Sequence, residues 1–164
     1  MLHAVLDLQT ILVEARDEER NTEAAYAAIV ERFGEVRPFI NIVDAEARHS
    51  RAIERQMERL GIAVPENGWI GKGTAPATLA AACESAIAGE IENIALYDRL
   101  LPQIPDVTTR SVLENLRDAS RDNHLLPSED AWRAKVGRPM EVPPHEGLGA
   151  VGDMDATGPG RPKR

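Results

Sequence analysis

The chain has 164 residues, which is enough for one domain with a sizeable core. Its formal net charge of -8 argues against a nucleic-acid-binding protein, because neutralising phosphates requires clustered Lys and Arg. Only 4% of its residues are aromatic, and Ala, Leu, Ile, Glu and Arg dominate, a mixture that suits helices and argues against a β-sandwich.

The first predicted helix spans residues 2–33 and carries an unexpected acid on its apolar face. Apolar residues recur there at spacings of three and four, the pattern of a packed helix: Val5, Leu8, Leu12, Ala15, Thr22, Tyr26, Ile29 and Phe33. Glu19 falls on the same face, between Ala15 and Thr22. A carboxylate in an apolar seam is costly unless something pairs with it.

The second and third predicted helices repeat this anomaly. Residues 37–60 place Glu46 and His49 on the apolar face, and residues 77–101 place Glu90 on theirs. Between these helices, a long connection rich in Gly and Pro has no periodicity. Glu90 is followed seven residues later by Tyr97, as Glu19 is followed by Tyr26, so the two halves of the chain form a weak internal repeat.

The fourth predicted helix spans residues 106–126, contributes His124, and is ended or kinked by Pro127. Short links predict two antiparallel hairpins, and the long connection between them can cross from one end of the bundle to the other. We therefore expect an all-α four-helix bundle over residues 1–136. Residues 137–164 are rich in Gly and Pro and are expected to form a flexible C-terminal tail.

Acids and histidines that face inward from several helices predict a bound metal. Glu46 and His49 are three residues apart, so both side chains can reach one ion. Carboxylates with imidazoles suit iron or manganese, and zinc is possible. The predicted ligands are Glu19, Glu46, His49, Glu90 and His124, and Tyr26 and Tyr97 are expected to be core residues that hydrogen-bond to them.

Helix 4 lacks the acid that would complete a symmetric site, because Arg121 stands three residues before His124. One alternative is therefore a metal-free structural bundle in which Arg121 pairs with the buried carboxylates, for example Glu90 or Glu46. In an intermediate case, Arg121 replaces one of two metal ions, and a single ion remains. The one cysteine, Cys83, rules out an internal disulfide and a rubredoxin-type iron site.

Residues 18–125 also resemble the ferritin-like superfamily. The resemblance rests on segments that include Glu18-Glu19 with Tyr26, Arg32-Phe33-Gly34, Val36-Arg37-Pro38-Phe39, Glu46-Ala47-Arg48-His49, Gly61-Ile62 with Val64-Pro65, Ala95-Leu96-Tyr97-Asp98-Arg99-Leu100 and Asn123-His124-Leu125. They look closest to a prokaryotic ferritin-like domain family of unknown function, distantly similar to rubrerythrin. This resemblance implies a four-helix bundle with a metal site at mid-bundle, but it implies no particular reaction.

The leading hypothesis is a non-haem iron protein, with one or two ions, that reacts with dioxygen or peroxide as an oxidoreductase. Whether it turns over, as a rubrerythrin-like peroxidase or a ferroxidase, is open, and a non-catalytic iron-binding or iron-handling protein is the alternative. An enzyme would need an external electron donor, since the chain lacks rubredoxin-type cysteines. We expect a cytoplasmic protein without a membrane span, and a homodimer is one possible assembly.

Overall fold

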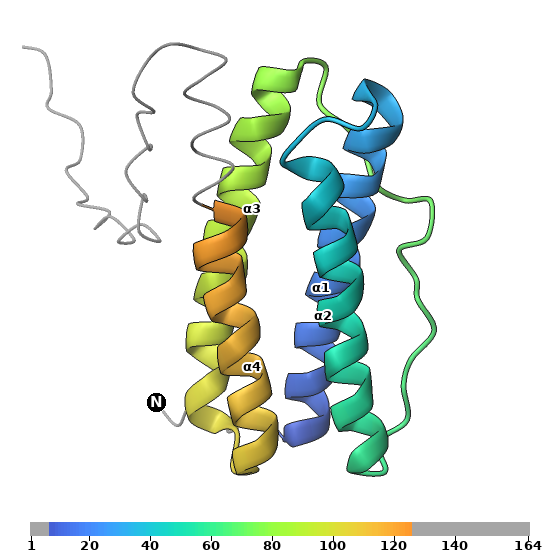
Figure 1. The fold of residues 1–164 in the computed structure, drawn as a ribbon. Coiled ribbons are helices and arrows are strands. Elements are labelled where there is room, and N and C mark those ends of the chain that lie inside the picture. Colours follow the sequence, from blue (N-terminus) through green and yellow to red (C-terminus); the bar gives the residue numbers. More distant parts are fainter. Residues whose placement is uncertain (1–6, 126–164) are drawn as a thin grey trace, which may run out of the picture.

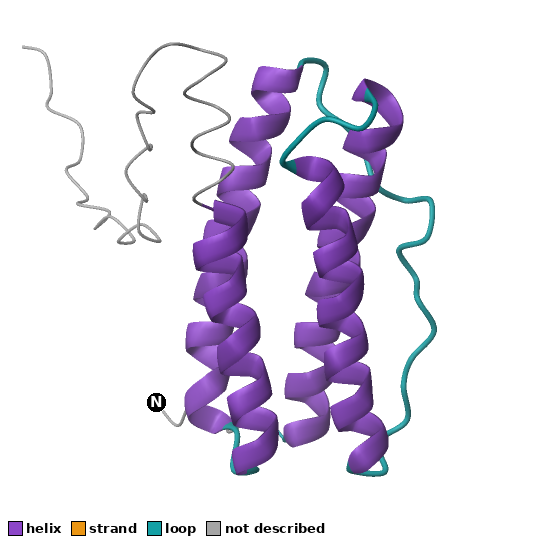
Figure 2. Ribbon diagram, in the orientation of Figure 1, coloured by secondary structure: helices purple, strands orange, loops and turns teal. Residues whose placement is uncertain are grey.

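The computed structural model describes residues 7–125, and within this range the protein is helical and contains no strand (Figures 1 and 2). The elements are α1 (Leu8–Phe33), α2 (Phe39–Arg59), α3 (Leu79–Leu100), the 3-10 turn η1 (Leu101–Gln103), α4 (Val107–Ala119) and the π-helical turn η2 (Ser120–Leu125). The prediction of an all-α bundle is thereby confirmed. The start of the first predicted helix, Pro127 and the tail at residues 137–164 lie outside the described residues.

The helix ends follow from short-range chemistry in the sequence. Asp7, Thr78 and Asp106 each cap a helix, because their side chains accept a hydrogen bond from the backbone N–H three residues later. Gly34 ends α1 with a φ of 82°, which glycine adopts without steric cost. Both α2 and α3 begin two residues later than predicted, at Phe39 and Leu79.

The four helices form two hairpins that pack side by side. Residues 34–38 join α1 to α2, and η1 leads from α3 into α4 (Figure 1). Residues 60–78 run along the outside of the first hairpin from one end of the bundle to the other. Each hairpin contacts the other through α1 with α3 and α2 with α4. Among the described helices, none is long and apolar enough to span a bilayer.

The connection at residues 60–78 is fixed to α1 at several points. The indole Nε1 of Trp69 donates to Asp17 Oδ1 at 2.9 Å, and the guanidinium of Arg16 donates to the carbonyl of Glu66 at 3.3 Å. Gly73 approaches the backbone of Ala24 so closely that a Cβ atom would overlap its carbonyl group. The connection therefore packs against the bundle along its length.

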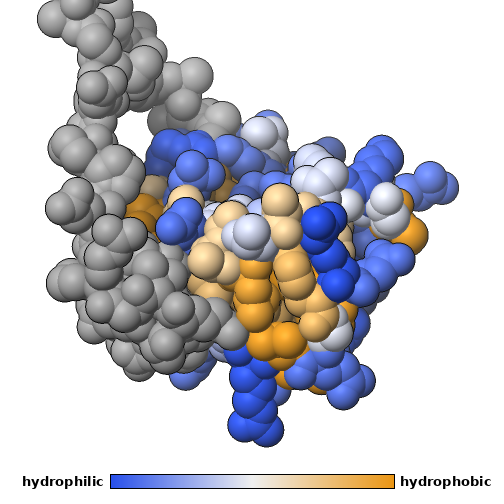
Figure 3. All heavy atoms as spheres, turned by 90° about the horizontal axis from the view of Figure 1, so that it is seen from above, coloured by the Kyte–Doolittle hydropathy of each residue, from blue (hydrophilic) through white to orange (hydrophobic). Residues whose placement is uncertain are grey.

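The core consists of two hydrophobic clusters at different heights in the bundle. The lower cluster contains Ile11, Leu12, Ala15, Ile53, Met57, Tyr97, Leu100, Leu101, Ile104, Leu113 and Leu116. The upper cluster contains Tyr26, Ile29, Phe39, Ile42, Ala82, Cys83, Ala86 and Ile87. Figure 3 looks down on the upper end, where hydrophobic residues gather within a partial rim of hydrophilic ones. Between the two clusters, most of the buried residues are polar, and the candidate site lies among them: Arg16, Glu19, Glu46, His49, Ser50, Glu90, Asn93, Ser120 and His124.

Candidate metal centre

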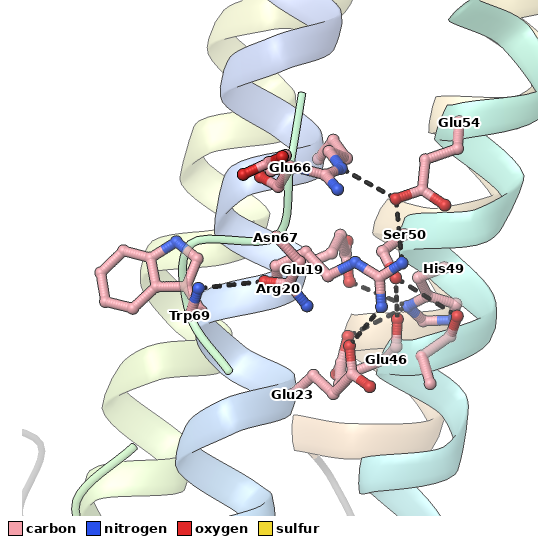
Figure 4. Close-up of polar contacts among 12 residues, drawn as sticks. Glu19, Arg20, Glu23, Glu46, His49, Ser50, Glu54, Glu66, Asn67 and Trp69 are labelled. Atoms are coloured by element: carbon pink, nitrogen blue, oxygen red, sulfur yellow. Dashed lines mark hydrogen bonds and ion pairs between the residues drawn. The ribbon is translucent and has the colours of Figure 1, made fainter. Parts of the chain in front are cut away.

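All five predicted ligands lie in the polar layer between the two hydrophobic clusters. Glu19 comes from α1, Glu46 and His49 from α2, Glu90 from α3 and His124 from the π-helical turn η2. The least buried of them, His49, is only 9% exposed. Figure 4 shows Glu19 on α1 directed towards Glu46 and His49 on α2. The fold therefore gathers into one place residues that are up to 105 positions apart in the sequence (124 minus 19).

Glu46 stands at the middle of this group, between the two imidazoles. One of its carboxylate oxygens lies 3.2 Å from Nδ1 of His49, and the other lies 2.9 Å from Nδ1 of His124. The two rings stack with their centroids 5.2 Å apart. One ligand atom from each of Glu46, His49 and His124 lies within 4.8 Å of the other two, so these three residues could hold one metal ion.

Glu19 and Glu90 flank this trio on opposite sides. Oε2 of Glu19 lies 3.2 Å from Nδ1 of His49, and Oε1 of Glu90 lies 3.6 Å from Nδ1 of His124. Each imidazole therefore faces two carboxylates, of which Glu46 is the shared one. The pair of Glu19 with His49 in the first hairpin thus corresponds to the pair of Glu90 with His124 in the second, as the internal repeat of the chain predicts.

Several of these buried atoms lack hydrogen bonds although their neighbours are close. Both carboxylate oxygens of Glu46, Oε2 of Glu90 and Nδ1 of His124 have no partner in hydrogen-bond geometry among the described residues. Leaving buried polar atoms unsatisfied costs about 1–3 kcal/mol each, and more for charged groups. When ligand atoms converge on one metal ion, they lie close to one another without being aligned for hydrogen bonds, as these atoms do. The donor set, carboxylates with imidazoles, fits a divalent metal ion.

The two tyrosines bind the outer carboxylates in a crossed arrangement. Tyr26 on α1 donates its hydroxyl to Oε1 of Glu90 on α3 at 2.7 Å, and Tyr97 on α3 donates to Oε1 of Glu19 on α1. Each tyrosine thus orients a carboxylate from the other half of the chain. Burial raises the pKa of both tyrosines well above its ordinary value, and the adjacent glutamate adds to this, so both remain hydrogen-bond donors.

When no metal ion is bound, protons balance the charge of the buried acids. Burial raises the pKa of Glu19 to about 8, and the nearby charge of Glu46 adds to the effect. Burial also opposes ionisation of Glu46, but its contacts with Glu19, His124 and His49 prevail and lower its pKa. Burial disfavours charge on the imidazoles too, yet contacts with the carboxylates outweigh it and raise the pKa of His49 to about 10 and that of His124 to about 9. A metal ion must therefore displace protons to bind.

Arg121 does not pair with the buried carboxylates, and this corrects one alternative drawn from the sequence. Its side chain is 49% exposed and forms ion pairs with Asp118 and Asp122. The reason is the π-helical turn η2, whose hydrogen bonds run from residue i to i+5. In this wider turn Ser120, four residues before His124, shares the buried face with it, and Arg121 is turned outward.

Two residues of the polar layer were missed in the sequence. Asn93 is 1% exposed and its amide donates to Oγ of Ser120, itself fully buried, at 3.3 Å. Asn93 lies three residues after Glu90 and four before Tyr97, so its position on the same helical face was a signal that could have identified it. Ser120 carried a similar signal, because it lies four residues after Leu116 and four before His124, the spacing of one helical face.

A network of ion pairs borders the site on the side of the long connection. Arg16 and Arg20 on α1 both contact Oε1 of Glu54 on α2, at 2.8 and 2.9 Å, and Arg20 also pairs with Glu23 (Figure 4). Arg16 is only 4% exposed. This network connects α1 to α2 next to the layer that contains Glu19 and His49, and so fixes the spacing of the two helices there.

The comparisons with known proteins inform the fold but not the site. The chain matches no protein-family model and no curated protein. Among solved structures it is similar to the crystal structure of hypothetical protein MJ0754 from Methanococcus jannaschii DSM 2661, with a TM-score of 0.71 and 19% sequence identity. The match covers 85% of this chain and 88% of the other. At this identity the likeness shows a shared fold alone.

Proposed function

We propose that this protein is a ferritin-like metalloprotein that binds iron in the middle of a four-helix bundle. Glu46, His49 and His124 would be the central ligands, with Glu19 and Glu90 beside them. The observation that carries the proposal is the environment of Glu46. This carboxylate is fully buried between two imidazoles, and its two oxygens have no hydrogen bonds among the described residues. The ferritin-like assignment is supported by two hairpins, a long connection, and a Glu-x-x-His pair opposite single glutamates.

The geometry favours one ion over two. A symmetric two-ion site of this class uses a second Glu-x-x-His pair, and here the helix-4 position is Arg121, which points to solvent. His49 and His124 both face Glu46, so a single ion shared by these three residues uses every inward imidazole. Iron is preferred because two imidazoles and one carboxylate with open positions are the ligand set of non-haem Fe(II) sites that react with dioxygen.

As the activity we propose oxidation–reduction with dioxygen or hydrogen peroxide. Bound iron would supply the electron, and the buried carboxylates would stabilise its oxidised, more highly charged state. Three central ligands do not fill the coordination positions of iron, which leaves room for a small oxidant. Tyr26 and Tyr97 would hold Glu90 and Glu19 in place, and reducing equivalents would come from an external donor.

The complete burial of Glu19 and Glu46 favours a second candidate, a protein that takes up Fe(II) and retains it without turnover. A site so enclosed releases an ion slowly. The two candidates share their ligands and differ in catalysis, so peroxide consumption in the presence of an electron donor separates them.

The test is metal content after anaerobic loading with Fe(II) and desalting, measured by inductively coupled plasma mass spectrometry. We expect about one iron per chain in the wild type, and loss of iron in Glu46→Gln and His49→Ala, each of which removes a central ligand. Glu92→Gln is the matched control, because Glu92 lies on α3 two residues from Glu90 but is exposed. Two irons per chain would contradict the single-ion site, and retention of no metal by the wild type would overturn the proposal.

A further inference from the structure

A pocket on the surface of the bundle leads to the candidate metal centre. It has a volume of about 290 Å³, lies between α2 and the end of α4 with η2, and is lined by both imidazoles together with residues that include Asn41, Arg48, Ala119 and Asn123. His49 and His124 are 9% and 3% exposed. Glu19 and Glu46, by contrast, are fully buried and do not line the pocket. The pocket is thus a route from solvent to the imidazole side of the centre.

The charge of this pocket is opposite to that of the protein. The chain has a net charge of -8, yet among residues 7–125 the pocket lining contains no acidic residue and includes the exposed Arg48. Within that same part of the chain, no ion pair or hydrogen bond engages the Arg48 guanidinium, whereas Arg117 on α4 and Arg121 on η2 are paired with aspartates. Arg48 directly precedes His49 in α2, so an unpaired guanidinium lies at the entrance of the pocket.

The pocket has room for a small ligand. A water molecule takes about 30 Å³ in the liquid, so the pocket holds about ten waters or an ion of a few atoms with part of its hydration. Behind the imidazoles lie three carboxylates, which leave a divalent or trivalent ion without excess positive charge. The attraction of an anion to the metal ion therefore requires positive charge from a residue that is not a ligand, and Arg48 supplies this charge.

We propose that this pocket is the entry port of the metal centre: neutral oxidants pass through it unaided, and Arg48 gives it additional affinity for small monovalent anions. The proposal rests on the proposed function, since it requires a metal ion held by Glu46, His49 and His124. Arg48 acts here as a specificity residue at the entrance. Asn41 and Asn123 add polar groups that solvate the entering ion.

The first test measures azide binding to the protein loaded with Co(II), whose visible absorption spectrum reports both metal retention and ligand binding. Arg48→Gln is expected to raise the dissociation constant for azide by roughly threefold to tenfold, the effect of removing one nearby charge at partial solvent exposure. Arg51→Gln is the matched control, because Arg51 is an exposed arginine one turn later on α2 that does not line the pocket. It should bind azide as the wild type does.

The second test uses nitric oxide as a neutral probe of the Fe(II)-loaded protein. Arg48→Gln should leave nitric oxide affinity within twofold of the wild type, whereas Ala119→Phe, which narrows the pocket, should slow the binding of both ligands at least fivefold. Ala95→Phe, on an exposed position of α3 outside the pocket, is the control for adding a large side chain. Far-UV circular dichroism verifies that each variant remains folded.

The outcomes separate the two proposals. Wild-type protein that retains no cobalt would overturn the metal site and the port together. Retained cobalt with equal azide affinity in Arg48→Gln and Arg51→Gln would overturn the role of Arg48 and leave the metal site standing. A wild-type rate of ligand entry in Ala119→Phe would show that ligands enter by another route.

Discussion

The crossed hydrogen bonds of Tyr26 and Tyr97 are the residue-scale feature that distinguishes this site from a chance cluster of acids. Each glutamate at the edge of the layer receives a hydroxyl from the opposite hairpin. A buried carboxylate that accepts such a bond keeps one orientation. In Glu19 the other oxygen, Oε2, then faces His49 at 3.2 Å, whereas in Glu90 the bonded oxygen, Oε1, is also the one that faces His124, at 3.6 Å. The tyrosines therefore set the geometry of the candidate ligands without contacting an ion themselves.

Replacing Tyr97 by Phe removes one of these bonds with almost no change of volume. We expect the metal-free variant to lose about 1–3 kcal/mol of unfolding free energy, because Glu19 is fully buried and one of its oxygens is left unsatisfied. Urea denaturation measures this loss. A double-mutant cycle with Glu19→Leu, which removes the accepting oxygen, isolates the pair, and a coupling energy near zero would contradict the assigned hydrogen bond.

Residue-scale reasoning from sequence found the inward glutamates and histidines because each interrupts an apolar repeat. Glu19 and Glu90 are identifiable from spacing alone, since a helix of known phase fixes which way a side chain points. Arg121 was assigned to the wrong face because its phase was counted along an ideal α-helix. Asn93 was overlooked because an amide on a helix seam is less conspicuous than a charge.

At the scale of elements, the sequence predicted the helices well and the π-helical turn not at all. The α2 and α3 helices begin two residues from the predicted positions, whereas α1 begins at Leu8, after its cap Asp7, rather than at residue 2. A shift of the hydrogen bonds from i+4 to i+5, as in η2, leaves no mark in the spacing of apolar residues, because only six residues take part. Tertiary packing against α3 determines that turn, and packing is not visible in a single sequence.

The long connection offers an element-scale prediction, because Gly73 lies against the backbone of Ala24. A Cβ atom at position 73 would overlap the Ala24 carbonyl group, and neither backbone can move without undocking the connection. We expect Gly73→Ala to destabilise the protein by about 1–3 kcal/mol and to speed proteolysis between α2 and α3. Urea denaturation and limited proteolysis measure the two effects.

Gly68 provides the control for this substitution, since it lies on the same connection and a Cβ atom there meets nothing within 4 Å. Gly68→Ala should change stability by no more than about 0.5 kcal/mol. Equal behaviour of the two variants would show that the connection does not pack on α1 in solution as it does here.

At the scale of the whole molecule, raising the pH should destabilise the metal-free protein and increase the stabilisation that a bound metal ion provides. His49 and His124 have pKa values of about 10 and 9 in the folded, metal-free protein, against 6.5 in a model peptide. Their contribution to stability is complete below pH 6.5 and is lost as pH rises through 9 to 10. Glu19, raised from 4.5 to about 8, has the same sign over a lower window. Glu46 has the opposite sign, and its contribution is lost only as pH falls below 4.5.

The melting temperature of the metal-free protein should therefore fall steadily between about pH 6 and pH 10. Metal binding needs neutral imidazoles and ionised carboxylates, so the increase in melting temperature on adding Fe(II) anaerobically should grow over the same range. Differential scanning calorimetry with and without metal measures both trends. A metal-free melting temperature that rises from pH 6 to pH 9 would contradict the charge states assigned to the polar layer.

The crossed tyrosines also bear on how the molecule comes apart. Neither hairpin holds a complete tyrosine–glutamate pair, since Glu19 depends on α3 and Glu90 depends on α1. If one hairpin opened alone, it would expose its own carboxylate and strip the hydroxyl from the carboxylate that stayed behind. Opening half of the bundle thus breaks both tyrosine–glutamate hydrogen bonds at once, which makes partly open states scarce. Two halves that resemble each other in sequence are in this way bound into one cooperative unit.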